Sequence, residues 1–192
     1  AKTAEEMLTQ QIEQGRADLE YLESVLVSLG EAESERDLSQ LREELTQAGV
    51  LSNKQTRNKK LRTKPVQAKP FHYRTSDGFD VFVGKNNLQN DLLTLKTAFK
   101  SDLWFHTQKI HGSHVILVAD GREPTEQAMT EAAMIAAYHS KARTSSLVPV
   151  DYTPVRQVKK PAGAKPGMVF YHVYQTAYVT PDEAIIEKLR VE

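Results

Sequence analysis

Three histidines lie close together in the middle of the chain: His106, His111 and His114, with Asp102 nearby. A zinc site needs three or four ligands that converge on one point. The flanking segments alternate like β-strands, whose successive side chains point to opposite faces, and no HExxH pattern is present. We therefore predict no metal site. Hydrogen-bonded, half-buried histidines and histidines that contact RNA are the other two interpretations.

A serine beside a histidine, Ser113 and His114, could provide a nucleophile and its base. Neighbours in a strand point to opposite faces, so these two side chains cannot pair directly. The G-x-S-x-G pattern of many serine hydrolases is also missing. We therefore predict no catalytic residues, no cofactor and no enzymatic activity.

Two glycine- and lysine-containing segments are better suited to bind phosphate. The first, residues 84–87 (Gly-Lys-Asn-Asn), precedes a segment with helical periodicity. Free backbone N–H groups at a helix start, together with Lys85, Asn86 and Asn87, would suit an anion. The alternative is a simple helix N-cap by an asparagine.

The second segment, residues 158–167, holds Lys159, Lys160 and Lys165 together with two prolines and two glycines. Proline stiffens a loop, and glycine lets backbone N–H groups approach a ligand closely. The spacing is not that of a Walker A loop. A phosphate-binding loop and a solvated hairpin are both compatible with this composition.

Aromatic side chains give the nucleic-acid interpretation further, weaker support. Trp104, Tyr171 and Tyr174 could stack on bases, although most of the seven tyrosines, six phenylalanines and one tryptophan should belong to the core. We predict that Trp104, His106 and His114 shape the central surface of the binding site.

Length and composition bound the class of protein. The chain has 192 residues, of which 40% are hydrophobic and 26% charged, as in ordinary globular proteins. Without cysteine it can form neither disulfides nor thiolate metal sites. No stretch approaches the roughly 18 consecutive apolar residues of a membrane span, and no secretory segment follows the start. We predict a cytoplasmic protein with no membrane contact and, because the chain begins with Ala1, a fragment of a larger one.

The balanced total charge conceals strongly charged segments. Residues 1–51 hold 12 acidic and 4 basic side chains, residues 52–70 hold 7 basic and no acidic ones, and residues 71–180 hold 12 basic and 9 acidic ones. Such segments indicate partners rather than fold. We divide the chain into an acidic helical segment (1–51), a basic linker (52–70) and a domain with a short acidic tail (71–192).

The linker lacks periodicity and is interrupted by two prolines. A solvated charge run and a phosphate-contacting arm are the two interpretations, and seven bases without an acid favour the second. Four bases are the candidate contacts: Arg57, Lys59, Lys60 and Arg62.

The acidic segment has the spacing of a coiled coil. Apolar positions alternate at intervals of four and three over three heptads, with one weak position at Gly15: Leu8, Ile12, Leu19, Leu22, Leu26 and Leu29. Gly30 marks a stop, and Ser34 is expected to cap a second helix. This seam either packs on the following domain or forms half of a coiled-coil arm whose partner lies upstream of Ala1. Left unpaired, it should promote self-association.

From residue 71 the apolar period changes to two. Alternating segments predict strands, and the Asp77-Gly78 pair predicts a hairpin turn. Helical periodicity appears at 88–99, on Leu88, Leu92, Leu95 and Phe99, and at 124–142, on Ala128, Ala132, Ile135 and Ala136. We expect an α+β fold, a mostly antiparallel sheet with two main helices preceded by the α-helical coiled-coil segment. The expected strands are 71–75, 79–83, 103–107, 113–118, 148–150, 155–158, 168–174 and 177–180.

The order of several motifs resembles the NFACT-R domain of the NFACT family, the bacterial RqcH group, also known as fibronectin-binding protein A-like. The resemblance covers roughly residues 71–180, and the acidic segment is similar to the distal half of the middle coiled coil that precedes this domain in the family. One departure is His111, where family members often have proline. The matching segments are residues 83–91, 102–107, 112–115, 150–153, 158–161 and 163–167.

The resemblance implies a cytosolic ribosome quality control factor that binds stalled large ribosomal subunits and tRNA. It also implies support of alanine tailing of nascent chains, with bond formation left to the ribosome. An acidic coiled coil would be repelled by RNA and better suits a basic ribosomal protein. A fibronectin-binding surface adhesin and a metal-dependent enzyme using His106, His111 and His114 are the alternatives.

Overall fold

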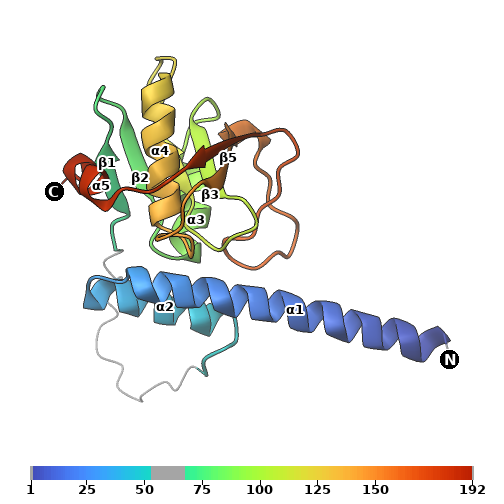
Figure 1. Ribbon diagram of the computed structural model, residues 1–192. Helices are drawn as coiled ribbons and strands as arrows, with labels where there is room; N and C mark the ends of the chain where they lie inside the picture. Colours follow the sequence, from blue (N-terminus) through green and yellow to red (C-terminus); the bar gives the residue numbers. More distant parts are fainter. Residues whose placement is uncertain (1, 53–67, 192) are drawn as a thin grey trace.

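The computed structural model of the protein describes residues 2–52 and 68–191. The first part is a helical hairpin of α1 (Lys2–Glu31) and α2 (Glu35–Gln47), and the second is an α+β domain built on one sheet. Figure 1 shows the hairpin lying along one end of the domain, with the N-terminal half of α1 extending beyond it. The predicted α+β class is confirmed. The four candidate bases of the linker lie outside the described residues: Arg57, Lys59, Lys60 and Arg62.

The turn between α1 and α2 is fixed by reciprocal hydrogen bonds. The Ser34 hydroxyl accepts from the Asp37 N–H (3.2 Å), which confirms the predicted cap, and the Asp37 carboxylate accepts from the Glu33 N–H (2.9 Å). Side-chain acceptors of this kind satisfy N–H groups that a helix start leaves free. α1 ends at Glu31, one residue past the predicted stop at Gly30.

The two helices of the helical hairpin pack on each other through side chains outside the predicted heptad seam. Tyr21 and Val25 of α1 pack against Leu41 of α2, and all three are buried. The seam residues of α1 are 40–66% exposed: Leu8, Ile12, Leu19, Leu22, Leu26 and Leu29. The interpretation in which this seam packs on the following domain is therefore wrong for the described part of the chain. A coiled-coil partner for it stays a prediction.

Six strands form one antiparallel sheet in the order β1-β2-β4-β3-β5-β6. The hairpin predicted at Asp77-Gly78 joins β1 to β2, and Gly78 has a φ of 90°, which glycine adopts without steric cost. The mostly antiparallel sheet is thus confirmed. The strands are β1 (Phe71–Arg74), β2 (Asp80–Val83), β3 (Leu103–Thr107), β4 (Val115–Leu117), β5 (Val148–Pro154) and β6 (Gln175–Val179).

Two strand predictions in the second half of the domain are wrong. The strand predicted at 148–150 is longer than expected and runs to Pro154 as β5. The separate strand predicted at 155–158 is absent, because Val155–Gln157 form a 3-10 turn. Residues 168–174 form only an isolated bridge, between Phe170 and Lys159. Their alternating pattern has another cause, because Tyr171 turns to the sheet and donates to the Asp151 carboxylate (2.8 Å).

The predicted acidic tail contains a helix, α5 (Glu183–Leu189). The Asp182 carboxylate accepts from the N–H groups of Ala184 and Ile185, and Ile186 is fully buried against the main core. A single buried side chain and one cap are too weak a pattern to stand out in a short, charged segment.

α4 (Glu126–Tyr138) covers one face of the sheet, in front of it in Figure 1. Thr125 caps its start by accepting from the Ala128 N–H (3.0 Å), and Ala128, Ala132 and Ala136 are buried. Small side chains let a helix lie close to its neighbour. The helix predicted over 124–142 is confirmed in position and is shorter at both ends.

The opposite face of the sheet carries α3 (Asn87–Leu92), which continues as a π-helix (Leu93–Thr97). Leu93 packs there with Trp104 of β3 and Ile116 of β4. The helix predicted over 88–99 is confirmed in position, but its last turn is π-helical.

The helical hairpin and the domain meet at a buried carboxylate. Glu44 of α2 is fully buried; it accepts from the Asn87 N–H at the start of α3 (3.2 Å) and from the Tyr21 hydroxyl (3.0 Å). Burial raises the pKa of the Glu44 carboxyl, against the lowering effect of the hydrogen bonds from Asn87 and Tyr21. The unpaired N–H groups of a helix start favour an anion, and here α2 supplies it.

Glutamine at position 44 can keep both contacts without the buried charge, because its Oε1 can accept from the Asn87 N–H while its Nε2 donates to the Tyr21 hydroxyl oxygen. Because the folded pKa of Glu44 lies above its ordinary value of 4.5, its stabilising contribution is present below that pH and is lost as the pH rises through the folded pKa. The free energy of unfolding of Glu44→Gln relative to wild type should therefore increase from pH 4 to pH 7 in urea titrations.

Glu44→Ala should be about 1–3 kcal/mol less stable than Glu44→Gln, since two buried donors lose their acceptor. The exposed neighbour Glu43→Gln is the matched control and should follow the wild-type pH curve. A Glu44→Gln variant that also follows the wild-type curve would contradict the assignment.

Gly167 should tolerate no side chain, because its φ is +80° and an added Cβ would lie 2.3 Å from the amide oxygen of the buried Asn87. Gly163 has a similar φ of +72° with open space around it, so Gly163→Ala reports the left-handed backbone cost alone, roughly 1–2 kcal/mol. Gly167→Ala should lose about 1–3 kcal/mol more in urea unfolding. Equal losses in the two variants would show that Asn87 can move aside.

Candidate nucleic-acid interface

The first glycine- and lysine-containing segment lies at the junction with the helical hairpin. Asn86 caps α3 by accepting from the Gln89 N–H (2.9 Å), which confirms the N-cap interpretation for this residue. Its amide nitrogen donates to Gln40 of α2 (3.0 Å), and that of Asn87 donates to Ser24 of α1 (2.9 Å). Both asparagines are buried and hold the two parts of the chain together.

Lys85 is brought to the same junction. Its ammonium group lies 3.3 Å from the buried Asp37 carboxylate and 4.7 Å from the centre of the Phe71 ring. A carboxylate of the chain thus neutralises this cation where phosphate was predicted. Contact of Lys85 with RNA stays a prediction and would require the pair to open.

In the second glycine- and lysine-containing segment, residues 158–167, two lysines are paired within the chain and one is exposed. Lys160 lies 2.9 Å from Asp91 and also donates to the carbonyl oxygen of Lys165 (2.8 Å). Lys165 pairs with Asp18 of α1. The Lys159 side chain is exposed, while its backbone is bonded in both directions to Phe170 (2.8 and 2.9 Å).

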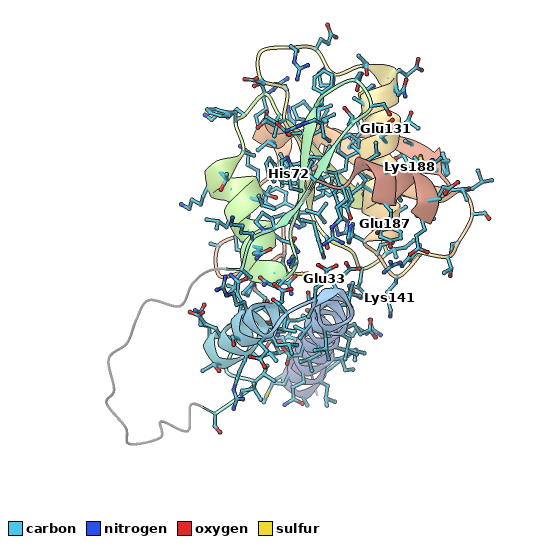
Figure 2. All side chains as sticks on the ribbon, turned by 90° about the vertical axis from the view of Figure 1, so that its left-hand side faces the viewer. Glu33, His72, Glu131, Lys141, Glu187 and Lys188 are labelled. Atoms are coloured by element: carbon cyan, nitrogen blue, oxygen red, sulfur yellow. The ribbon has the colours of Figure 1, made fainter. Side chains whose placement is uncertain are left out.

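Acidic side chains of the hairpin meet basic ones of the domain along the whole junction. Figure 2 shows Glu33 at this junction, in the loop between α1 and α2. Two of these pairs involve histidines that are charged only when protonated. The pairs are Asp37–Lys85 (3.3 Å), Glu33–Arg190 (2.7 Å), Glu31–His139 (2.6 Å), Glu23–His111 (3.0 Å) and Asp18–Lys165.

The central aromatic residues form one cluster on the face of the sheet that carries α3. The rings of Trp104 and His106 are parallel within 5° at 5.6 Å, and His114 stands perpendicular to both, at 5.3 and 5.7 Å. Tyr171 tilts against Trp104 at 4.8 Å. The alternation of β3 places Trp104 and His106 on this face, as the sequence predicts.

His114 is fixed in one neutral form. Its Nε2 lies 3.1 Å from the carbonyl oxygen of Gly167, which can only accept, so Nε2 carries the proton. Its Nδ1 then accepts from the Thr94 hydroxyl (2.8 Å). Burial, with the neighbouring His106, lowers the pKa of His114 to about 3, and burial also lowers the pKa of His106. Both imidazoles are therefore neutral at physiological pH.

These rings line a cavity of about 380 Å³ between the sheet and α1. Trp104 and His114 form its inner wall, Tyr171 lies beside them, and Glu20 and Ser24 of α1 close the opposite side. Among the described residues, Trp104 Nε1 is the only buried side-chain nitrogen or oxygen without a hydrogen-bond partner. Trp104 is only 1% exposed, so this donor is covered by the surrounding side chains and does not face the cavity.

The described residues include no group of three or more His, Cys, Asp or Glu that could hold a metal ion. His111 instead pairs with Glu23, and His114 with Thr94 and Gly167. The interpretation of His106, His111 and His114 as the centre of a metal-dependent enzyme is not favoured.

No helix in the described part of the chain is long and apolar enough to cross a membrane.

An exposed surface of which sequence reasoning predicted only Lys159 lies on the α3 face of the domain. We call it the basic–aromatic surface; its members are Lys96, Phe99, Lys100, Arg156, Lys159 and Phe170. The Arg156 N–H donates to the Lys100 carbonyl oxygen (3.3 Å), so the two chain segments touch, and Lys159 follows within about 10 Å of chain. Phe99, expected on the apolar side of a helix, is 74% exposed. The four cations take part in none of the ion pairs found between described residues.

Two family models match the chain. The NFACT protein RNA binding domain matches residues 69–172, and the NFACT N-terminal and middle domains match residues 1–64. The chain is 44% identical over 190 residues to the Rqc2 homolog RqcH of Bacillus subtilis and 43% identical over 191 residues to that of Streptococcus suis. Each comparison covers 99% of this chain and 33% of the relative, so the chain spans about a third of their length.

A solved structure has the same fold. It is the C-terminal part of the fibronectin/fibrinogen-binding protein from Streptococcus suis, with a TM-score of 0.88, 42% identity, and coverage of 99% of this chain and 74% of that one. Coiled-coil domain-containing protein 25 of Bos taurus is 30% identical over 102 residues, 50% of this chain. Because the RNA binding domain model covers more than half of the chain, the chain belongs to the NFACT family and carries that family's RNA binding domain.

Proposed function

We propose that this chain is the RNA-binding part of a ribosome quality control factor that works in the cytoplasm. In this proposal it binds the large ribosomal subunit and tRNA and supports alanine tailing, and it catalyses nothing itself. The match to the NFACT RNA binding domain over residues 69–172 is the observation that carries the proposal. The RqcH relatives, similar over 99% of the chain, support the assignment to ribosome quality control.

The basic–aromatic surface is the part of the domain best suited to RNA. Its cations can neutralise phosphates, and exposed rings can stack on unpaired bases. Lys85 and Lys165, by contrast, are paired with acids of the hairpin. RNA contacts by Lys85, Asn86, Asn87, Lys160 and Lys165 require these internal contacts to rearrange.

The acidic helical hairpin suits a different partner. RNA repels a surface of this charge, whereas a basic ribosomal protein attracts it. The exposed heptad leucines of α1 would also allow self-association or pairing with another helix. A fibronectin-binding adhesin is not favoured: the name of the Streptococcus suis structure belongs to that protein, and the family match here is to an RNA binding domain.

Charge removal from the basic–aromatic surface tests the proposal. Binding to purified large ribosomal subunits should weaken with salt, and Lys100→Gln/Lys159→Gln should flatten the log–log salt slope by about 1.4–1.8, since each lost phosphate contact removes about 0.7–0.9. The control is Lys141→Gln/Lys188→Gln, which removes the same charge just after α4 and on α5 (Figure 2), on the other side of the sheet.

The control double variant should keep the wild-type slope. An equal loss in both variants would mean that only net charge matters, and no binding by wild type at low salt would refute RNA binding by this chain.

A further inference from the structure

The two edges of the sheet differ in what covers them. β1 forms one edge, and its outer side is occupied: Tyr73 forms a bridge with Arg190, and the Val191 N–H donates to the His72 carbonyl oxygen (2.9 Å). β6 forms the other edge, with β5 along its inner side and α4 against one face. No strand or bridge within residues 2–52 and 68–191 pairs with the outer side of β6. The described part of the chain therefore leaves one edge of the sheet open.

The register of β5 and β6 shows which backbone groups lie on this open edge. The Pro149 carbonyl oxygen accepts from an N–H just after β3 (2.9 Å), so the backbone of Pro149 points toward β3 and that of Val150 toward β6. Ala177 lies opposite Val150, so its N–H and C=O groups face β5. The N–H and C=O groups of its neighbours, Thr176 and Tyr178, therefore point away from the sheet and make no hydrogen bond to described residues.

The segment that carries the open edge lacks the features that protect most edges. Edge strands usually have charges, a proline or a bulge that prevents pairing with another chain. Residues 168–180 contain no Asp, Glu, Lys, Arg, Pro or Gly. Tyr178 is 67% exposed, and Leu147, at the start of the neighbouring strand, is 68% exposed. An uncharged segment rich in tyrosine, valine and threonine is of the type that pairs with copies of itself.

β6 is complementary to a second copy of itself. Two antiparallel copies of this five-residue strand overlap completely when their Ala177 residues lie opposite each other. The same register places Thr176 opposite Tyr178 of the second copy, and the backbone groups of both residues point outward, as pairing requires. An aromatic residue opposite a β-branched one stabilises a strand pair, and no like charges face each other. Each copy then uses the same surface, as in most symmetric dimers.

We propose that two copies of this chain pair through the outer edges of β6, antiparallel, about a two-fold axis at Ala177. The pairing joins two six-stranded sheets into one continuous sheet. An axis of this kind keeps corresponding faces on the same side, so both basic–aromatic surfaces lie on one side of the joined sheet. The pairing does not depend on the proposed RNA binding. Where both hold, the dimer presents two RNA-binding surfaces to one partner, which raises affinity without new contacts.

The exposed heptad seam of α1 is the competing surface for self-association, and it offers a matched control. Leu26 of the seam is 66% exposed, and Tyr178 is 67% exposed. Lysine at either position adds the same charge in place of an equally exposed apolar or aromatic side chain. At position 178 the two added charges lie near the axis of the proposed dimer, where like charges are destabilising.

Sedimentation equilibrium at fixed salt tests the pairing. Wild type should show a monomer–dimer equilibrium between about 10 μM and 1 mM, the range of a weak interface. Tyr178→Lys should raise the dimer dissociation constant at least about tenfold, whereas Leu26→Lys should leave it unchanged. A loss with Leu26→Lys alone would assign association to α1, and equal losses would assign it to net charge; either result overturns the proposal. A monomeric wild type would also overturn it and leave the edge to an extended segment of another protein.

Cysteine cross-linking tests the register without a charge change, because the chain has no cysteine of its own. At the proposed axis the two Ala177 Cα atoms lie about 4.5 Å apart, within the range of about 4.4–6.8 Å that a disulfide spans. Ala177→Cys should form a disulfide-linked dimer on oxidation, whereas Ala162→Cys, in an exposed loop, should stay mostly monomeric at the same concentration. Equal cross-linking of both variants, or none of either, would overturn the pairing. If Tyr178→Lys does not fold, this comparison still decides.

Discussion

The Glu44 carboxylate at the start of α3 is the contact on which the arrangement of the whole chain depends. It comes from the helical hairpin, is fully buried, and accepts hydrogen bonds from Tyr21 of α1 and from the Asn87 N–H of the domain. A buried carboxylate is costly unless donors surround it, so the hairpin can dock only where a helix start offers them. This requirement fixes α1 and α2 against α3 more specifically than the partly exposed pairs Glu33–Arg190, Glu23–His111 and Asp18–Lys165 around it.

α3 extends this constraint into the domain. The Asn90 side-chain oxygen accepts from the His114 N–H (3.1 Å), and the Asp91 carboxylate accepts from the Gly167 N–H (3.0 Å) and pairs with Lys160. Gly167 in turn accepts from His114. One short helix therefore aligns the hairpin, β4 and the lysine-containing loop, and polar residues that look suited to bind phosphate are used for positioning.

Local signals in the sequence predicted local structure well. The Ser34 cap, the Asp77-Gly78 turn and the alanine stripe of α4 each depend on neighbours within a few residues. Contacts between distant segments could not be predicted: a single sequence does not indicate that Asp37 neutralises Lys85. Phe99 belonged to the apolar pattern predicted for 88–99, but the π-helix ends at Thr97, so Phe99 lies beyond the helix and is exposed.

The cavity lies where the docked hairpin meets the domain. Its inner wall belongs to the domain, at Trp104 and His114, whereas Glu20 and Ser24 belong to α1, so the complete cavity exists only while the hairpin is docked. A ligand that binds the complete cavity must then stabilise docking by the same free energy by which docking favours the ligand. Asn87 links the two places, because its backbone N–H donates to Glu44 and its side-chain amide donates to Ser24. A change at the buried carboxylate therefore reaches the cavity through two hydrogen bonds. Occupation of the cavity and the orientation of the acidic helices are therefore coupled by the construction of the fold.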